Sequence, residues 1–346
     1  MSDMTRRSFV GTAALAATGP MIMGATNKAG TSRPILGEGE HKYEAIHDWG
    51  ELPSRIKYGN THSVVRDSQG HIYVHHTVHA TSESPDSVVV YDEKGKFVRS
   101  WGKQYKGGAH GLYLHKEGNT EYLLFCDQLH GIVSKRTLKG EEVWTIGYPS
   151  EAEPYKIKAD RSRPVYRPTN LAIAPNGDIY VGDGYGSSYI NQYNSKGDYI
   201  RTFGGLGKDA GQLWTPHGIW IDTRGSQPTV MVADRSNKRI QNFTLDGKHI
   251  GFVNGVKSPC HFHNRGDMVV VPDLVSRVTL LDKDNKVITH LGDGGDDARK
   301  LREKDRDAFI PGKFICPHGA CFDPDGNIFV VEFVEVGRVT KLRKVA

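Results

Sequence analysis

The sequence predicts an all-β protein that folds as a six-bladed β-propeller, with four-stranded blades around a central channel. Two observations carry this prediction: a short module recurs six times, and Gly-containing turns separate its strands. Gly and Pro supply 40 and 16 of the 346 residues, more than an average chain contains. Repeats of roughly 40–50 residues with four short strands each are typical of propeller blades.

Each copy of the module has the same order of features. A polar or Pro-containing opening leads into an apolar strand, an Asp/Asn-x-x-Gly turn, and a strand of Ile-Tyr-Val type that ends in Asp. Two more strands follow, joined by a Lys-Gly or Asp-Gly turn, and residues 167–204 show the order best. The segments 148–166 and 293–310 interrupt the pattern and are predicted to be surface loops or a short helix. A β-sandwich would accommodate the strands but not the repeated opening signature.

The N-terminal residues resemble an export signal. Arg6 and Arg7 form a twin-arginine pair before a short, weakly apolar stretch at 12–23. Such a signal is read by the twin-arginine export machinery, so we expect a periplasmic or secreted protein; a basic tail is the alternative. The chain then divides into a signal peptide (1–25), an N-terminal segment (26–50) and the propeller domain (51–346).

Composition argues against several classes of protein. The 45 basic and 40 acidic residues alternate without forming a block, so a nucleic-acid partner is not expected. No apolar run reaches the ~18–20 residues that span a bilayer. The four cysteines form no Cys-x-x-Cys pair, which argues against a cysteine zinc site and leaves any disulfide pairing open. These cysteines are Cys126, Cys260, Cys316 and Cys321.

The opening residues of the six copies carry the functional prediction. The first strand of each propeller blade lines the channel, so equivalent residues converge on its axis. They stand 44 to 60 positions apart and are His62, His110, Asn170, His217, Cys260 or His261, and His318.

Three of these histidines occupy alternate blades. His110, His217 and His318 are 107 and 101 residues apart, which predicts nearly threefold spacing around the axis. Three imidazoles with one open position form the usual catalytic zinc site, so we predict that this set binds Zn²⁺. The alternative is that channel histidines only bond one another or water. His75, His76 and His79 follow the second strand of blade one and either reach the cavity mouth or form a surface cluster.

Several short motifs resemble one known family. His110-Gly-Leu112, Pro216-His217, Pro317-His318, Asp183-Gly-Tyr185 and the segment 232–241 are similar to those of the peptidyl-α-hydroxyglycine amidating lyases, within the NHL-repeat propellers. The resemblance covers about residues 55–346. It implies zinc bound by the three histidines, with Tyr185 as catalytic base and Arg235 as an active-site arginine. From the residues alone, Tyr185 could equally be a channel-mouth aromatic and Arg235 an ion-pair partner of Asp234.

The resemblance implies a reaction that eliminates glyoxylate from a peptide ending in α-hydroxyglycine and leaves the peptide amide. Zinc would polarise the substrate hydroxyl and Tyr185 would take its proton. Because the NHL scaffold hosts many functions, two alternatives stay open: a lactonase-like metal hydrolase, and a non-catalytic module that binds a protein or glycan.

The sequence also departs from the family pattern. The family's substrate-holding arginine of blade one falls near His76, and no arginine stands nearby. Gly319 replaces an Asp that helps to hold a structural calcium, so a Ca²⁺ site is not supported, and Cys316 replaces a Met. We therefore expect a hydroxylated small molecule or peptide end whose carboxylate is recognised differently. The residues predicted to line the substrate space are His62, His76, Asn170, His261 and Cys316.

Overall fold

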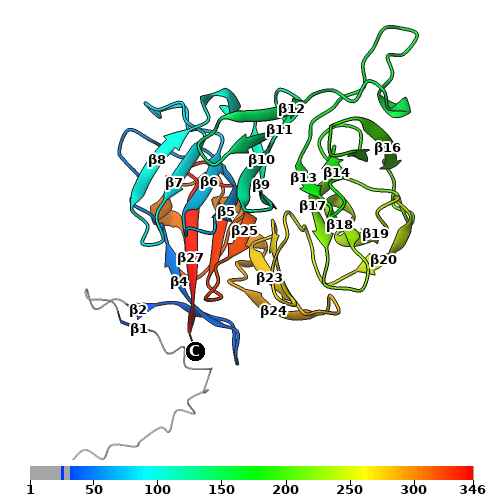
Figure 1. Ribbon diagram of the computed structural model, residues 1–346. Helices are drawn as coiled ribbons and strands as arrows, with labels where there is room; N and C mark the ends of the chain where they lie inside the picture. The colour runs from blue at the N-terminus through cyan, green and yellow to red at the C-terminus, as the bar shows by residue number, and fades with distance from the viewer. Residues whose placement is uncertain (1–24, 27–31, 346) are drawn as a thin grey trace, which may run out of the picture.

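The computed structural model describes residues 25–26 and 32–345, so the twin-arginine pair predicted at Arg6 and Arg7 lies outside the described residues. Six antiparallel sheets stand around a central axis, and in most pairs of neighbouring blades the first strands are in contact with each other (Figure 1). The prediction of an all-β, six-bladed propeller is confirmed.

Each of the first five blades is a four-stranded meander. From the channel outwards, blades one to three contain β5 (Thr61–Arg66), β6 (Ile72–His76), β7 (Val88–Tyr91) and β8 (Phe97–Trp101); β9 (Ala109–Glu117), β10 (Thr120–Asp127), β11 (Ile132–Thr137) and β12 (Glu142–Ile146); and β13 (Asn170–Ile173), β14 (Ile179–Gly182), β15 (Tyr189–Tyr193) and β16 (Tyr199–Gly204). Blades four and five contain β17 (Pro216–Asp222), β18 (Thr229–Asp234), β19 (Arg239–Phe243) and β20 (His249–Val253); and β21 (His263–Arg265), β22 (Met268–Asp273), β23 (Arg277–Leu281) and β24 (Val287–Leu291).

Blade six is assembled from both ends of the described chain. It contains β25 (Pro317–Phe322), β26 (Ile328–Glu332) and β27 (Arg338–Val345), and then β4 (Lys42–His47) and β3 (Ile35–Leu36). β4 pairs with β27 from Lys42–Val345 to His47–Thr340. Tyr43 and Ala45 of β4 are buried in one cluster with Leu342, which fixes this register. Part of the segment 26–50 thus belongs to the ring, and its hydrogen bonds close the circle (Figure 1). The short strands β1 (Ala25–Thr26) and β2 (Ser32–Arg33) pair with each other.

The Asp-x-x-Gly module makes the turn between the first two strands. In blade one, Asp67 accepts hydrogen bonds from the backbone N–H groups of Gln69 and His71 at 3.0 and 2.8 Å. Gly70 has a φ of +94°, a conformation that side chains disfavour, so glycine is required at this point. The repeated module is therefore a repeated hairpin turn, as the sequence predicts.

The hydrophobic core lies between neighbouring blades. The contact of blades one and six buries Val74 and Val89 against Phe329 and Val331. Blades three and four are joined in the same way by a separate cluster. Apolar side chains therefore fill the gaps between these blades.

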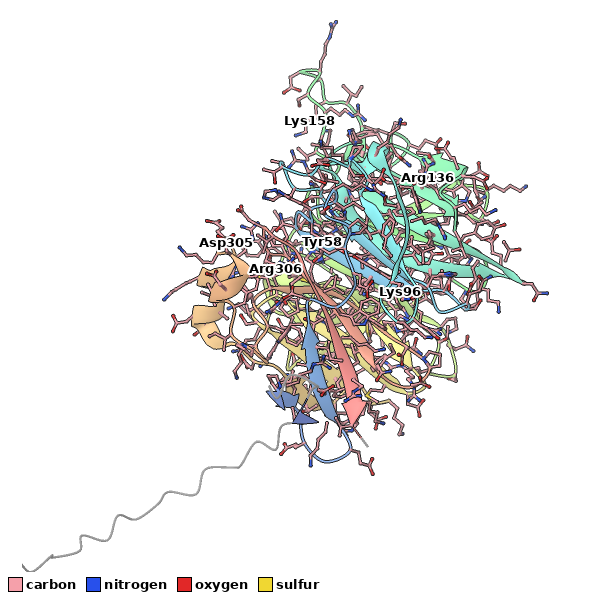
Figure 2. The ribbon with its side chains drawn as sticks, turned by 90° about the vertical axis from the view of Figure 1, so that its left-hand side faces the viewer. Tyr58, Lys96, Arg136, Lys158, Asp305 and Arg306 are labelled. Carbon is pink, nitrogen blue, oxygen red and sulfur yellow. The ribbon has the colours of Figure 1, made fainter. Side chains whose placement is uncertain are left out.

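Two irregular segments leave the ring. Residues 148–166 contain η2 (Glu153–Tyr155), and Lys158 in this segment projects away from the body (Figure 2). Residues 293–310 contain α1 (Gly295–Ala298), η4 (Arg299–Leu301) and η5 (Arg306–Ala308), as the predicted loops or short helix. The other short helices are η1 (Lys103–Tyr105) and η3 (Arg235–Asn237). No helix in the described part of the chain is long and apolar enough to cross a membrane.

Candidate functional site

Three histidines meet at one end of the channel. His110, His217 and His318 stand near the starts of β9, β17 and β25, and their ring centroids lie 4.7, 4.7 and 4.9 Å apart. All three rings are buried. At each of these positions the pairing between the first and second strands of the blade shifts in register. Such a β-bulge changes the direction of the side chain, here that of the histidine. The structure thus brings together the set predicted from alternate blades.

A glycine follows each histidine because the next blade passes close by. A Cβ added at Gly111 would lie 2.6 Å from the carbonyl oxygen of Thr169, and one at Gly319 would lie 2.6 Å from that of His62. At Gly218 the corresponding distance to the Cys260 carbonyl oxygen is 2.8 Å. A side chain at 319 therefore does not fit this backbone, which gives a physical reason for the missing calcium ligand.

The same three carbonyl groups orient the imidazoles. Nδ1 donates to the carbonyl oxygen of Thr169 from His110 (2.6 Å), of Cys260 from His217 (2.7 Å), and of His62 from His318 (2.8 Å). Since a carbonyl can only accept, Nδ1 carries the proton and the Nε2 lone pair is free. Histidine ligands of metals are oriented in this way.

The protonation state of the histidines also suits a metal. Burial lowers the pKa of His110 to about 3 and holds the pKa values of His217 and His318 well below the usual range. The imidazoles are therefore neutral at pH 7, as metal ligands must be. The Nε2 atom of His318 is buried and has no hydrogen-bond partner. Three neutral nitrogen donors with one such unpartnered atom fit Zn²⁺.

Tyr185 and Arg235 complete the centre. The hydroxyl oxygen of Tyr185 lies 3.2 Å from Nε2 of His110 and 3.0 Å from Nε2 of His217. Arg235 donates from Nη1 to the same hydroxyl oxygen at 3.2 Å. Burial raises the pKa of Tyr185 above its ordinary value, and the guanidinium of Arg235 opposes that rise. The cation thus favours the phenolate form of this tyrosine.

Local structure explains how these two side chains reach the channel. Tyr185 lies in the turn after β14. In this turn the carboxylate of Asp183 accepts hydrogen bonds from the backbone N–H groups of Arg167 and Ser187, at 2.7 and 2.6 Å. Arg235 begins η3, directly after β18. Asp234 pairs with Arg239 at 2.7 Å, so the alternative that Arg235 serves as the partner of Asp234 is not what the structure shows.

Two further side chains approach the histidines closely enough to share a metal. Ligand atoms of His62, His110 and His318 lie within 4.8 Å of one another, as do those of His217, Cys260 and His318. The described residues therefore offer His/Cys groupings that can hold a metal. Only His110, His217 and His318 share the Nδ1-to-carbonyl arrangement, because Nδ1 of His62 is buried without a partner. Each of the two groupings contains two of His110, His217 and His318 together with one of the further side chains.

Cys260 was not predicted as a site residue, although the sequence left open whether Cys260 or His261 opens blade five. The structure shows Cys260 beside Arg235 and His217, whereas Nδ1 of His261 is buried without a partner. All four cysteines of the chain are buried free thiols. The Cys-His pair in the sequence was the available signal, but the sequence could not decide which of the two residues faces His217 and His318.

The remaining predicted residues occupy varied places. His62 contacts the rings of His318 and His110, at 4.6 and 4.9 Å between centroids. Asn170 is buried, and its Oδ1 accepts a hydrogen bond from the N–H of Leu171 at 2.7 Å. Cys316 is buried in a small cluster with Ile315 and Val334.

His76 holds a loop. Its Nδ1 accepts a hydrogen bond from the N–H of Val78 at 3.1 Å, and its ring packs edge-on against Tyr58. In the other five blades a carboxylate at the end of the second strand, or directly after it, accepts backbone N–H groups in the same way: Asp127, Asp183, Asp234, Asp273 and Glu332. His76 is thus the blade-one equivalent of these loop-holding carboxylates.

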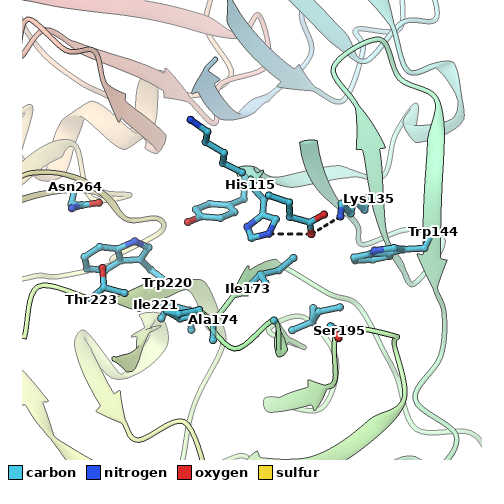
Figure 3. Close-up of a pocket in the computed structure, with 16 residues that line it drawn as sticks. His115, Lys135, Trp144, Ile173, Ala174, Ser195, Trp220, Ile221, Thr223 and Asn264 are labelled. Carbon is cyan, nitrogen blue, oxygen red and sulfur yellow. Dashed lines mark ion pairs between the residues drawn. The ribbon is translucent and has the colours of Figure 1, made fainter. Parts of the chain in front are cut away.

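Two of the hollows in the described structure bear on the candidate site. One of about 460 Å³ lies at the far ends of the inner strands, where His115 and Lys135 both pair with Glu117 (Figure 3). Because His115 stands near the end of β9 and His110 near its start, this hollow opens away from the histidines. Another, of about 500 Å³, is lined by Tyr185 itself, with Leu206, Trp214 and others. This second hollow therefore adjoins the candidate centre.

Comparisons with known proteins find relatives of two kinds. The chain is 29% identical over 184 residues to peptidyl-glycine α-amidating monooxygenase of Mus musculus, covering 50% of this chain and 17% of that protein. It is 26% identical over 217 residues to peptidyl-α-hydroxyglycine α-amidating lyase 1 of Drosophila melanogaster (55% and 38%). It is 26% identical over 239 residues to NHL repeat-containing protein 3 of Homo sapiens (64% and 65%). The match therefore spans less than two thirds of each of these relatives. The resemblance predicted from the motifs is confirmed.

Solved structures extend the likeness to other propellers. A streptogramin B lyase superposes with a TM-score of 0.57 at 13% identity, over 89% of this chain and 99% of that one. A gluconolactonase of Xanthomonas campestris superposes with a TM-score of 0.56 at 12% identity, over 95% and 99%. At such identities the likeness concerns the fold alone. No family model matches the chain.

Proposed function

We propose that this protein is an exported, zinc-dependent lyase of the amidating-lyase type, acting on a hydroxylated peptide end or small molecule. One observation carries the proposal. The imidazoles of His110, His217 and His318 are neutral, and each has Nδ1 held by a neighbouring carbonyl; two of them, His110 and His217, lie within hydrogen-bond distance of the hydroxyl of Tyr185, which Arg235 also holds. Export is proposed from the twin arginines alone.

The roles of the residues follow from their chemistry. Zn²⁺ held by His110, His217 and His318 would supply a Lewis acid and a positive charge beside the substrate hydroxyl. Tyr185 would act in its phenolate form, which the positive charges of Arg235 and of a bound Zn²⁺ would both favour against the effect of burial. In that form its oxygen, within hydrogen-bond distance of two of these ligands, can accept the proton that the substrate loses. Arg235 stabilises the phenolate that takes this proton, because its Nη1 donates to the same oxygen.

The proposed reaction balances without a further reactant. The proton of the substrate hydroxyl passes to Tyr185, and the electron pair of that O–H bond forms the C=O bond of glyoxylate. The bond between this carbon and the amide nitrogen breaks, and the nitrogen takes up a proton to give the amide. Buried Tyr185 can return the proton to the leaving nitrogen and is then ready for another turnover.

The donor set argues against the lactonase-like alternative. Calcium requires six to eight oxygen ligands. The buried carboxylates that end the second strands are occupied by backbone N–H groups; Asp273, for example, accepts from Lys257 and Ser258 at 2.7 and 2.5 Å. The channel thus presents nitrogen rather than oxygen donors to a metal, and a nitrogen-rich site favours zinc.

The test is glyoxylate release from an α-hydroxyglycine derivative by the purified protein, loaded with Zn²⁺ and compared with the chelated protein and with His217→Ala. We expect zinc-dependent release by the wild type and none by the variant. Zinc-loaded wild-type protein that releases no glyoxylate would refute the reaction. Release that persists after chelation would refute the role of the metal.

A further inference from the structure

An arginine other than Arg235 reaches the mouth of the channel. Arg302 directly follows η4 in the segment 293–310. Its guanidinium carbon lies 4.1 Å from the ring centre of Phe333, and its Nη2 donates to Oδ1 of Asn60 at 3.3 Å. Asn60 immediately precedes β5 and Phe333 immediately follows β26. Both therefore stand at the end of the channel that carries the histidines.

Phe333 connects this arginine to the candidate centre. The centroid of its ring lies 5.3 Å from that of His62 and 6.0 Å from that of His318. Arg302 is thus separated from the ring of His318 by one aromatic side chain. An arginine stacked on an aromatic ring keeps its planar edge free for hydrogen bonds.

The guanidinium of Arg302 holds only weak partners. Its Nη1 is 3.3 Å from the carboxylate of Glu303, which is 71% exposed, and exposed ion pairs contribute little to stability. Its Nε is buried without a hydrogen-bond partner. By contrast, Arg338 nearby is buried against Glu332 and also donates to the carbonyl oxygen of Lys313. Arg302 therefore already pairs with a carboxylate and can exchange it readily for another.

We propose that Arg302 is a positioning residue that holds a carboxylate of the substrate at the channel mouth. The substrate is then an anion as well as a hydroxylated molecule. A guanidinium matches a planar carboxylate by two parallel hydrogen bonds, which orients the bound molecule as well as attracting it. The proposal rests on the proposed lyase for the reaction, but carboxylate binding is measurable without turnover.

The binding experiment uses zinc-loaded protein and two probes, mandelate and its uncharged amide, with affinities measured by calorimetry at pH 7. The variants are Arg302→Gln and Arg302→Lys. Lys300→Gln is the matched control, because it removes one positive charge from the same segment, where Lys300 is exposed and pairs with Asp297. Zinc content and thermal midpoint are measured for each, and Arg302→Lys replaces Arg302→Gln if the latter is misfolded.

We expect the wild type to bind mandelate at least ~10-fold more tightly than the amide. A hydrogen bond to a charged group accounts for about a 10- to 100-fold change in affinity, so Arg302→Gln should weaken mandelate by that factor and leave the amide unchanged. Arg302→Lys should restore part of the preference, and Lys300→Gln should behave as wild type. A wild type without preference for the carboxylate, or an Arg302→Gln variant that keeps it, overturns the proposal.

Turnover separates this inference from the proposed reaction. If glyoxylate is released, Arg302→Gln should raise KM by about the same factor while kcat changes little. If the wild type releases none but Arg302→Gln still abolishes the preference for mandelate, the lyase reaction is refuted and the role of Arg302 stands. If release is normal and the preference is unaffected, the inference about Arg302 fails and the lyase stands.

Discussion

Replacing Tyr185 by Phe removes one hydroxyl and keeps the ring. That hydroxyl lies 3.2 and 3.0 Å from two histidine Nε2 atoms and accepts a hydrogen bond from Arg235. A general acid–base group contributes ~10²- to 10⁴-fold to a rate, which is about 3–5 kcal/mol of transition-state stabilisation. We expect kcat for glyoxylate release to fall by that factor with KM nearly unchanged. Each lost hydrogen bond costs only about 1 kcal/mol of stability, so the variant should remain folded and retain zinc.

The matched control is Tyr180→Phe in the same blade, which removes a hydroxyl that donates to the carbonyl oxygen of Leu245 at 2.8 Å. Both variants are assayed at saturating α-hydroxyglycine derivative, with glyoxylate measured over time and zinc quantified in each sample. Tyr180→Phe should retain the wild-type kcat. A zinc-loaded Tyr185→Phe protein with more than about a third of the wild-type kcat would show that Tyr185 is not the proposed acid–base group.

Two further predictions concern stability. Glu332→Ala removes a buried carboxylate that pairs with buried Arg338 and accepts hydrogen bonds from the N–H groups of Ile315 and Cys316. The free energy of unfolding, measured with urea, should therefore fall by about 3–5 kcal/mol. A fall of less than about 1 kcal/mol would contradict this prediction. Burial lowers the pKa of His76 to about 3 and of His261 and His263 to about 4, from an ordinary 6.5. The unfolded chain therefore binds protons that the fold excludes, so this stability is complete above pH ~6.5 and is lost as pH falls toward ~4, by up to about 1.4 kcal/mol per pH unit for each histidine. Urea titrations of the chelated protein at pH 7, 6 and 5 measure the slope, and stability that is constant or rises toward pH 5 would contradict the assignment.

The sequence was sufficient to predict the ring and its three alternate-blade histidines because both recur at equivalent positions of the repeated module. The turn at Asp67 to Gly70 and the His-Gly pairs that begin the inner strands are local signals with local causes. Strand pairing between the two ends of the chain has no such local signal. The place of β4 beside β27 therefore emerged only from the structure.

The direction of side chains in the irregular segments could also not be predicted from the sequence. Arg302 follows a short helix in an insert, so nothing in the repeat predicts that it stacks on Phe333. The choice between Cys260 and His261 depends on a single step of register before β21. The place of His76 near the substrate stays a prediction from its alignment with a family arginine, and the sequence did not indicate that its Nδ1 accepts a hydrogen bond from the N–H of Val78.

The central claim is that His110, His217 and His318 hold one metal ion per chain. The most direct measurement is the zinc content of purified wild type, His217→Ala and His62→Ala after dialysis against a weak chelator. His62 is the informative control, because its ring lies 4.6 Å from that of His318 but its Nδ1 lacks the carbonyl bond that orients the other three. We predict about one zinc per chain in the wild type and in His62→Ala, and loss of zinc in His217→Ala. Retention by His217→Ala together with loss in His62→Ala would contradict the claim.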